Sequence, residues 1–171
     1  MQPPEVKTTG KRAKTPEQAL AALMRLCARA EKSQVDARRL RGWGLAEREG
    51  EQVLARLVRD RFIDDGRYAE AFVRDKLRLS GWGEYKIRTA LQRKRIDREL
   101  IDAALAQADR QDMAGRLRQQ LERKMRTTRH TTQYELKTKL IRYGLSLGYD
   151  YETVLDSAAA LVTDTETCDE F

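Results

Sequence analysis

Apolar residues recur at helical spacing near the start of the chain. Leu20, Leu23, Met24 and Cys27 follow one another at i, i+3, i+4 and i+7, the spacing that places side chains on one face of an α-helix. The preceding string Thr15-Pro16-Glu17-Gln18 combines an N-cap hydroxyl, a proline at the first helical position and the glutamine of a capping box. The pattern predicts an amphipathic helix over about residues 16–30.

The same kind of pattern continues to the end of the chain and predicts nine helices in three groups of three. Glycines at 42, 44, 81 and 83 lie between predicted helices and are interpreted as helix stops. The groups are related in sequence, because Gly83-Glu-Tyr85-Lys-Ile87-Arg-Thr-Ala-Leu91 matches the string from Thr132 to Leu140 at an offset of 49 residues. A weaker match, Ser33 to Ala37, lies 50 residues upstream.

This repetition predicts an all-α fold built from tandem three-helix-bundle repeats, elongated and curved, in which each triplet packs a small core and docks on its neighbours. A single globule made of the three triplets remains the alternative. The predicted segments are a disordered N-terminal arm (1–14), three repeats (15–62, 63–109 and 110–162) and an acidic C-terminal tail (163–171).

The charge of the chain favours an acidic or polyanionic partner. Its net charge is +7 and its pI about 9.6, and a positive field steers association with nucleic acid or an acidic protein face. There are nine basic and three acidic residues between Arg74 and Arg98, and nine basic and two acidic ones between Arg116 and Arg142. The segment from Gly144 to Phe171 has seven acidic residues and no basic one. A basic surface that is merely solvated is the alternative interpretation.

The cysteines are typical of a protein of the reducing cytoplasm, and we expect the chain to be a monomer. Cys27 and Cys168 are the only cysteines and form no disulfide framework. Neither a signal-peptide core nor a run of about 18 apolar residues occurs, so we expect neither export nor a membrane span.

No set of residues predicts catalysis, a metal or a cofactor. His130 lies in a polar run without partner ligands, and the glycines form no phosphate loop. Asp64 and Asp65 form a carboxylate pair that in another setting binds a metal ion. Because they stand where a helix begins, N-capping is the favoured interpretation.

The strongest candidate for binding is a group of cations around the Gly81-Trp82-Gly83 break, called here the basic corner. Trp82 is expected to pack between helices, with stacking on a nucleic-acid base as the alternative. Lys76, Arg78, Lys86 and Arg88 are expected on solvent-facing sides of their helices. The basic corner consists of Arg74, Lys76, Arg78, Lys86, Arg88, Arg93, Lys94 and Arg95.

The string Phe62-Ile63-Asp64-Asp65-Gly66-Arg67-Tyr68-Ala69-Glu70-Ala71-Phe72 resembles the hallmark segment of the RecX regulatory family, an Asp-Asp-x-Arg-aromatic motif followed by Ala and Phe. The family's Gly-aromatic-Gly break and following helix are matched by Gly81-Trp82-Gly83 and Lys86-Ile87-Arg88. The chain departs from the family at Lys94-Arg95-Ile96, where the family usually has glycine between lysine and isoleucine. Since non-glycine residues disfavour a left-handed C-cap, the turn is expected to differ locally.

The resemblance implies tandem three-helix units that lie in the helical groove of the RecA filament and restrain the ATPase, strand-exchange and co-protease activities of RecA. The basic corner is then the expected contact with RecA or, weakly and without sequence preference, with DNA. An autonomous helix-turn-helix-like DNA-binding protein and a helical-repeat adaptor are the alternatives.

Within the family motif, Asp64 and Asp65 are expected to cap helices, and Arg67 is expected to form an ion pair within or between triplets. Phe62, Tyr68 and Phe72 are expected to form a seam between the first two triplets, and Trp82 and Gly83 complete the motif. A direct contact of Asp65 or Arg67 with RecA is the alternative to these structural roles.

Overall fold

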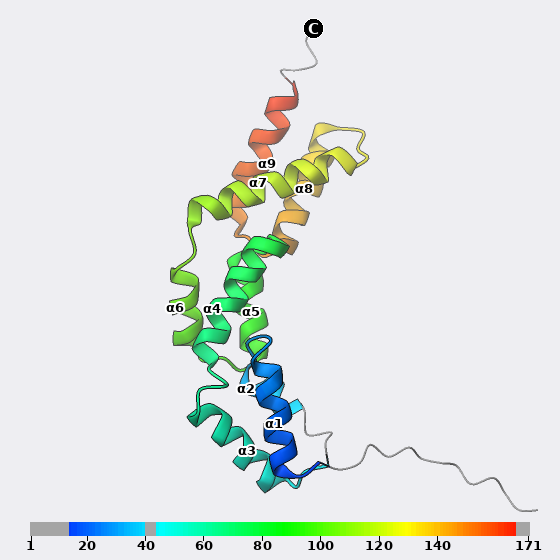
Figure 1. Ribbon diagram of the computed structural model, residues 1–171. Helices are drawn as coiled ribbons and strands as arrows, with labels where there is room; N and C mark the ends of the chain where they lie inside the picture. The colour runs from blue at the N-terminus through cyan, green and yellow to red at the C-terminus, as the bar shows by residue number, and fades with distance from the viewer. Residues whose placement is uncertain (1–13, 40–43, 167–171) are drawn as a thin grey trace, which may run out of the picture. The chain divides into compact units, whose positions relative to one another are not determined.

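The computed structural model describes residues 14–39 and 44–166, and this part of the chain is all-helical (Figure 1). It contains nine α-helices and one π-helical turn, and no strand occurs among the described residues. The predicted all-α class is confirmed. The expected N-terminal arm lies outside the described residues up to position 13, as do Gly42 in the predicted helix stop and the end of the acidic tail.

The chain divides into two compact units, residues 1–68 and 69–171. The boundary falls inside α4 (Asp65–Asp75), which starts the second triplet of helices. Along the chain the triplets are α1–α3, α4–α6 and α7–α9. In the described part of the chain no helix is long and apolar enough to span a bilayer.

The first unit contains α1 (Pro16–Cys27), α2 (Gln34–Arg39) and α3 (Glu47–Arg59). Its core is formed by buried Leu23, Val53, Leu54, Leu57 and Ile63, against which the rest of the predicted α1 stripe packs. The capping box predicted for α1 is present, since the Gln18 N–H donates to Thr15 Oγ1 at 3.3 Å and the Thr15 N–H donates to Gln18 Oε1 at 3.3 Å.

The second unit contains the rest of α4, the π-helical turn η2 (Lys76–Ser80), α5 (Glu84–Arg93) and α6 (Arg98–Ala106). These are followed by α7 (Arg110–Thr127), α8 (Gln133–Leu147) and α9 (Tyr151–Glu166), which pack together as a three-helix bundle (Figure 1). The bundle core includes Leu117, Leu121, Leu136, Leu140 and Val154. Leu117 and Leu121, four residues apart on α7, therefore form its buried face.

Within the second unit, the break before α5 docks on the turn between α8 and α9. The Gly83 N–H donates to Leu147 O at 2.8 Å, and the Tyr85 N–H donates to Gly148 O at 3.0 Å. A methyl group added to Gly83 would overlap the backbone of Gly148 and Tyr149. Gly81 is the expected helix stop, with φ of 61°, whereas Gly83 is a point of close backbone approach.

The turn after α5 corrects one expectation about local structure. Arg95 takes φ of 56°, the left-handed conformation that glycine usually supplies. The residue after it, Ile96, is buried and donates its N–H to Leu91 O at 3.3 Å. Burial of Ile96 and this hydrogen bond keep the chain in the turn despite the unfavourable backbone conformation, so the predicted departure in geometry is wrong.

Candidate functional site

The two aspartates of the family motif cap two different helices. Asp64 Oδ1 accepts the N–H groups of Gly66 at 2.9 Å and Arg67 at 3.1 Å, so it caps α4. Asp65 reaches back to the start of α2, where it accepts the backbone N–H of Gln34 at 3.1 Å and the Gln34 side-chain amide at 3.0 Å. Asp64 thus caps the helix that begins at the motif, as expected, whereas Asp65 caps α2 and joins the first turn of α4 to it.

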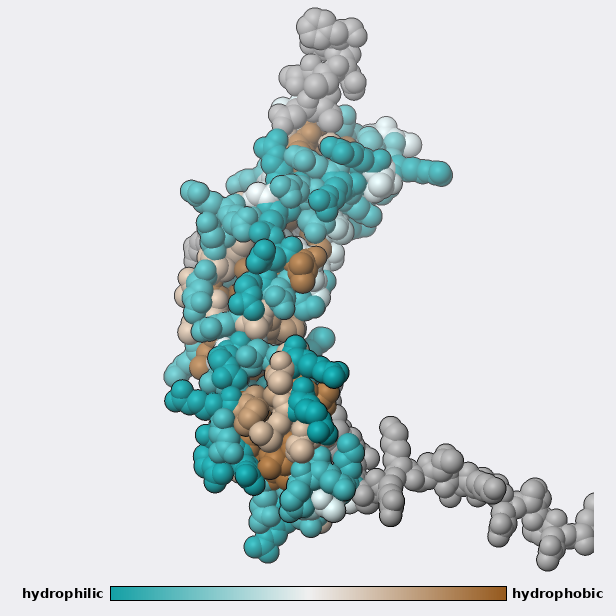
Figure 2. All heavy atoms as spheres, viewed as in Figure 1, coloured by the Kyte–Doolittle hydropathy of each residue, from teal (hydrophilic) through white to brown (hydrophobic). Residues whose placement is uncertain are grey.

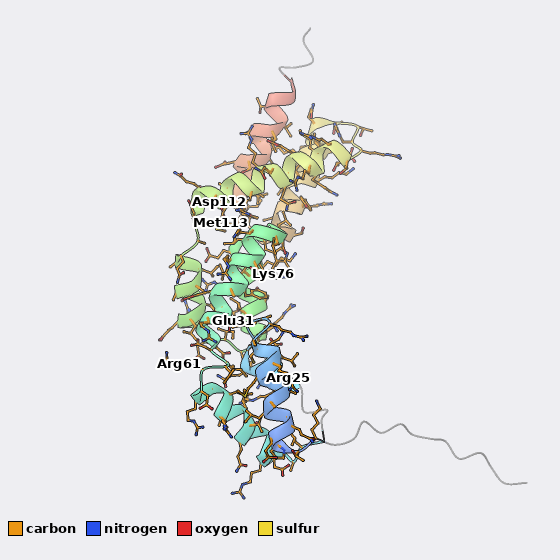
Figure 3. The ribbon with its side chains drawn as sticks, in the orientation of Figure 1. Arg25, Glu31, Arg61, Lys76, Asp112 and Met113 are labelled. Carbon is orange, nitrogen blue, oxygen red and sulfur yellow. The ribbon has the colours of Figure 1, made fainter. Side chains whose placement is uncertain are left out.

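Arg67 forms the ion pair that the sequence predicts. Its Nε lies 3.2 Å from Glu31 Oε1, and its Nη2 donates to the carbonyl of Arg61 at 3.1 Å. Glu31 and Arg61 are labelled in Figure 3. Arg61 is the second non-glycine residue at positive φ, also 56°, so the guanidinium of Arg67 binds the carbonyl of a strained turn.

The aromatic residues of the motif lie in different surroundings. Phe62 packs against the core of the first unit and Tyr68 is buried. Phe72 is half-buried, and its ring meets that of Trp82 edge-on at 6.4 Å and 70°. The seam between the first two triplets that these residues were expected to form stays a prediction.

Trp82 is the centre of the basic corner and is covered by lysines. The Nζ atoms of Lys76 and Lys86 lie 4.7 Å and 4.8 Å from the centre of its ring, a geometry in which the negative face of the ring attracts the ammonium groups. Lys86 also donates to Ser146 O at 3.1 Å. These contacts hold the two lysines against the protein.

Arg88 is also held by intramolecular contacts. Its guanidinium pairs with Asp102 and with Glu84, the latter at 3.1 Å, and the hydrogen bonds that it donates, chiefly the one to Asp102, raise the pKa of Arg88. Lys76, Lys86 and Arg88 are half-buried, so their charges are less available to a partner than the charge of exposed Arg78, the fourth cation expected to face solvent. The physical reason is that a π face and two carboxylates lie within their reach.

The other cations of the basic corner differ in exposure and pairing. Arg74 is exposed and lies 3.8 Å from Asp75, and Lys94 is half-buried. Arg78, Arg93 and Arg95 are exposed, and none of them has an ion pair among the described residues. These three arginines are the ones whose charge is available to a partner.

The structure adds residues to the site that the sequence analysis missed. A hollow of about 370 Å³ between α5 and the end of α8 brings Trp82, Lys86 and Arg93 together with Tyr85 and Leu145. Tyr85 is 74% exposed and Tyr134, its repeat-related counterpart, is 82% exposed. The sequence could have indicated this exposure, because each tyrosine lies two residues before a buried apolar residue of its helix, Ile87 or Leu136, and therefore off the apolar face.

The site has the chemistry of a binding surface. No group of three or more His, Cys, Asp or Glu side chains that could hold a metal ion occurs among the described residues. His130 is exposed and its Nδ1 lies 3.1 Å from Thr128 O. The exposed arginines, lysines over an indole ring and exposed tyrosine form a surface suited to acidic or phosphate-bearing partners.

Comparison with known proteins identifies the family. Residues 64–105 match the model of the RecX second three-helix domain and residues 111–156 that of the RecX third three-helix domain. The chain belongs to the RecX family. The first stretch lies in the second triplet and contains the whole basic corner, and the second stretch lies in the third triplet.

Curated relatives agree with this assignment. "Regulatory protein RecX" of Clostridium botulinum Eklund 17B is 33% identical over 97 residues, which are 56% of this chain and 45% of that protein. The Serratia proteamaculans protein of the same name is 33% identical over 104 residues, 61% of this chain and 60% of that one. The chain thus matches less than half of the clostridial relative.

Solved RecX structures share the fold. The Lactobacillus salivarius RecX crystal structure superposes with a TM-score of 0.72 at 19% identity, over 86% of this chain and 96% of that one. Another RecX regulatory protein superposes with a TM-score of 0.73 at 22% identity, over 81% of this chain and 68% of that one. At these identities the likeness concerns the helical fold.

Proposed function

We propose that this chain binds RecA filaments in their helical groove and modulates the recombinase, ATPase and co-protease activities of RecA by inhibition, with weak, non-specific contact to DNA. The proposal assigns it no catalysis of its own and a cytoplasmic location. The observation that carries it is the match of two consecutive triplets to RecX three-helix domains. A direct contact of Asp65 or Arg67 is not needed, because both side chains are engaged within the first unit.

Three unpaired arginines give this proposal a specific surface. Arg93 lines the hollow that contains Trp82 and Tyr85, and Arg78 and Arg95 are exposed elsewhere in the second triplet. Guanidinium groups bind carboxylates and phosphates through paired N–H donors. Either an acidic protein surface or the DNA inside a filament would meet this requirement.

The test is co-sedimentation of the full chain with RecA filaments, with and without DNA, together with RecA's ATPase rate. The triple variant Arg78→Gln, Arg93→Gln, Arg95→Gln should fold normally, because the three side chains have no ion pair in the described part of the chain. It should require at least tenfold more protein to inhibit the ATPase and should show a shallower salt dependence of binding.

The matched control is Arg25→Gln, Arg29→Gln, Arg48→Gln, which removes three exposed and unpaired arginines of the first unit. Both variants lower the formal charge from +7 to +4, so net charge is held equal. The control should inhibit RecA as the wild type does. Absence of wild-type co-sedimentation would refute the proposal, and tight binding to one DNA sequence without RecA would favour an autonomous DNA-binding protein.

A further inference from the structure

A second basic surface lies in the third triplet, outside the basic corner. An open hollow of about 570 Å³ is formed where the last turn of α7 and the following connection meet α8. In Figure 2 the surface over α7 and α8 is mostly hydrophilic. No acidic residue lines the hollow, which is formed by Lys124, Thr127, Thr128, Arg129, Lys139, Arg142 and Tyr143.

Some carbonyl groups at the end of α7 and in the connection after it accept hydrogen bonds from side chains of the protein. Thr127 Oγ1 and Thr128 Oγ1 donate to Lys124 O at 3.1 Å and 2.6 Å. Lys139 Nζ donates to Arg129 O at 2.8 Å. A helix C-terminus ordinarily presents unpaired carbonyls and partial negative charge, which repel an anion. Here hydroxyl and ammonium donors reduce that repulsion at the hollow.

Three of the four cations remain electrostatically uncompensated. The charge of Lys139 is offset by Glu135, 2.6 Å away. The side chains of Arg129 and Arg142 are exposed and have no ion pair within the described ranges, and Lys124 has none either. In the same triplet, Arg116 and Arg118 do have carboxylate partners, Asp112 and Glu122. Within the described part of the chain, Lys124, Arg129 and Arg142 thus lack the carboxylate partner that these two arginines have.

Tyr143 gives the hollow a fixed aromatic wall. Its hydroxyl donates to Gln120 Oε1 at 3.2 Å, and Lys124 Nζ lies 5.5 Å from the centre of its ring. The ring orients the ammonium group by cation–π attraction. A lysine beside two arginines in an open hollow provides several donors for the oxygens of successive phosphates.

We propose that this hollow, called here the third-triplet hollow, binds the phosphate groups of a nucleic-acid strand. The inference deepens the weak, non-specific DNA contact of the proposed function, on which it rests, by assigning a named surface that should bind nucleic acid without RecA. Nucleic acid is favoured over a small anion because the hollow is open and carries its cations on both α8 and the segment after α7, an arrangement that admits a polymer. Arg129 and Arg142 bind phosphate oxygens through their guanidinium groups, and Lys124 contributes a point charge.

The test measures fluorescence anisotropy of a labelled single-stranded 20-nucleotide DNA of mixed sequence with the full chain, without RecA. The triple variant Lys124→Gln, Arg129→Gln, Arg142→Gln should bind at least tenfold more weakly at low salt. For single strands each lost phosphate contact lowers the log–log salt slope by about 0.7, so the slope should fall by about 2. The Arg25, Arg29 and Arg48 variant is the charge-matched control and should change affinity less than threefold.

Two further arms identify the ligand and separate this inference from the proposed function. Inorganic phosphate should displace the labelled DNA only at millimolar concentrations, because one phosphate ion replaces one of the several phosphate contacts that the strand makes. The hollow variant should still co-sediment with RecA filaments formed on DNA. Wild-type DNA affinity in that variant, or an equal loss in the control, would overturn the inference. Loss of RecA binding with unchanged DNA binding would also overturn it, by identifying a protein-binding surface, while the proposed function would stand.

Discussion

Two arginines in the left-handed conformation show how single residues determine the turns between helices. Arg61 and Arg95 both take φ of 56°, a conformation in which the Cβ atom crowds the following carbonyl. Gly148, at φ of 91°, ends α8 in the same way without that penalty. In the turns at Arg95 and Gly148, the residue that follows is buried, Ile96 in one and Tyr149 in the other. Burial of that next side chain holds the backbone in place.

Arg95→Gly should therefore stabilise the fold. Relief of the left-handed conformation is worth about 1 kcal/mol, and the greater flexibility of glycine in the unfolded chain offsets part of it. The free energy of unfolding from urea titration should rise by about 0.5–1 kcal/mol. The exposed Arg95 side chain has no ion pair in the described part of the chain whose loss would cancel this gain.

Gln92→Gly is the control for this substitution. Gln92 is exposed and lies within α5, where glycine should cost about 0.5–1 kcal/mol relative to alanine. The free energy of unfolding should rise in Arg95→Gly and fall in Gln92→Gly. Destabilisation by Arg95→Gly would show that the arginine side chain contributes more to the folded state than its strained backbone costs.

At the scale of elements, α8 begins with a carboxylate that is held by several donors. Glu135 accepts hydrogen bonds from the Thr131 N–H at 2.9 Å and from Thr131 Oγ1 at 2.8 Å, and it pairs with Lys139 at 2.6 Å. The bond from Lys139, followed by those from Thr131, lowers the pKa of Glu135 from 4.5 to about 2. The ionised carboxylate thus ties the α7–α8 connection to α8.

This pKa makes the stability of α8 depend on pH. Since the folded-state pKa is below the ordinary value, the stabilisation is present in full above about pH 4.5 and is lost as the pH falls toward 2. The difference in unfolding free energy between the wild type and Glu135→Gln should shrink across that interval in urea titrations. The effect is modest because the group is exposed to solvent.

Glu99→Gln provides the comparison, because Glu99 is exposed and has no ion pair among the described residues. The difference in unfolding free energy between the wild type and Glu99→Gln should change less over the same pH interval. An equal pH response of the two variants would contradict the role assigned to Glu135.

The contact of α5 with the α8–α9 turn depends on the absence of a side chain at Gly83. In Gly83→Ala the new methyl group would meet backbone atoms of Gly148 and Tyr149, which cannot move aside as a flexible side chain does. The hydrogen bonds from Gly83 to Leu147 and from Tyr85 to Gly148 should lengthen or break. We expect a loss of about 1–3 kcal/mol in unfolding free energy, measured by thermal or urea unfolding.

Gly115→Ala is the matched control, because nothing lies within 4 Å of the added methyl group in the middle of α7. It should stabilise the protein by about 0.5–1 kcal/mol through the higher helix propensity of alanine. If Gly83→Ala were as stable as the wild type, the second and third triplets would not depend on this close approach.

At the scale of the whole molecule, the fold determines which cationic side chains have a partner within the described part of the chain and which have none. Arg88 and Arg116 form ion pairs with carboxylates of the same chain, Glu84 and Asp112. The ammonium groups of Lys76 and Lys86 lie over the indole ring of Trp82. Among the unpaired cations in the described part of the second unit, Arg93 lies beside Trp82, and Lys124, Arg129 and Arg142 line the third-triplet hollow. The net charge of +7 is consistent with the two proposed binding surfaces, the basic corner and the third-triplet hollow.

The sequence by itself determined the all-helical fold, several helix starts and the family. Apolar residues at i, i+3 and i+4 must be buried whatever the arrangement of the helices, as Leu117 and Leu121 are, and caps such as Thr15 act over three residues. These features depend on neighbours that are close in sequence. The RecX assignment likewise rests on local strings around Asp64 and Gly83.

Only the tertiary structure decided which cations are available to a partner. Lys86 and Ser146 are 60 residues apart in sequence, and Arg88 and Asp102 are 14 apart, so neither contact follows from helical periodicity. The role of Gly83 also depends on a turn more than 60 residues away, at Gly148. Pairing and close approach are set by the packing of one helix on another, because electrostatic and steric contacts act over a few ångströms in space irrespective of distance along the chain.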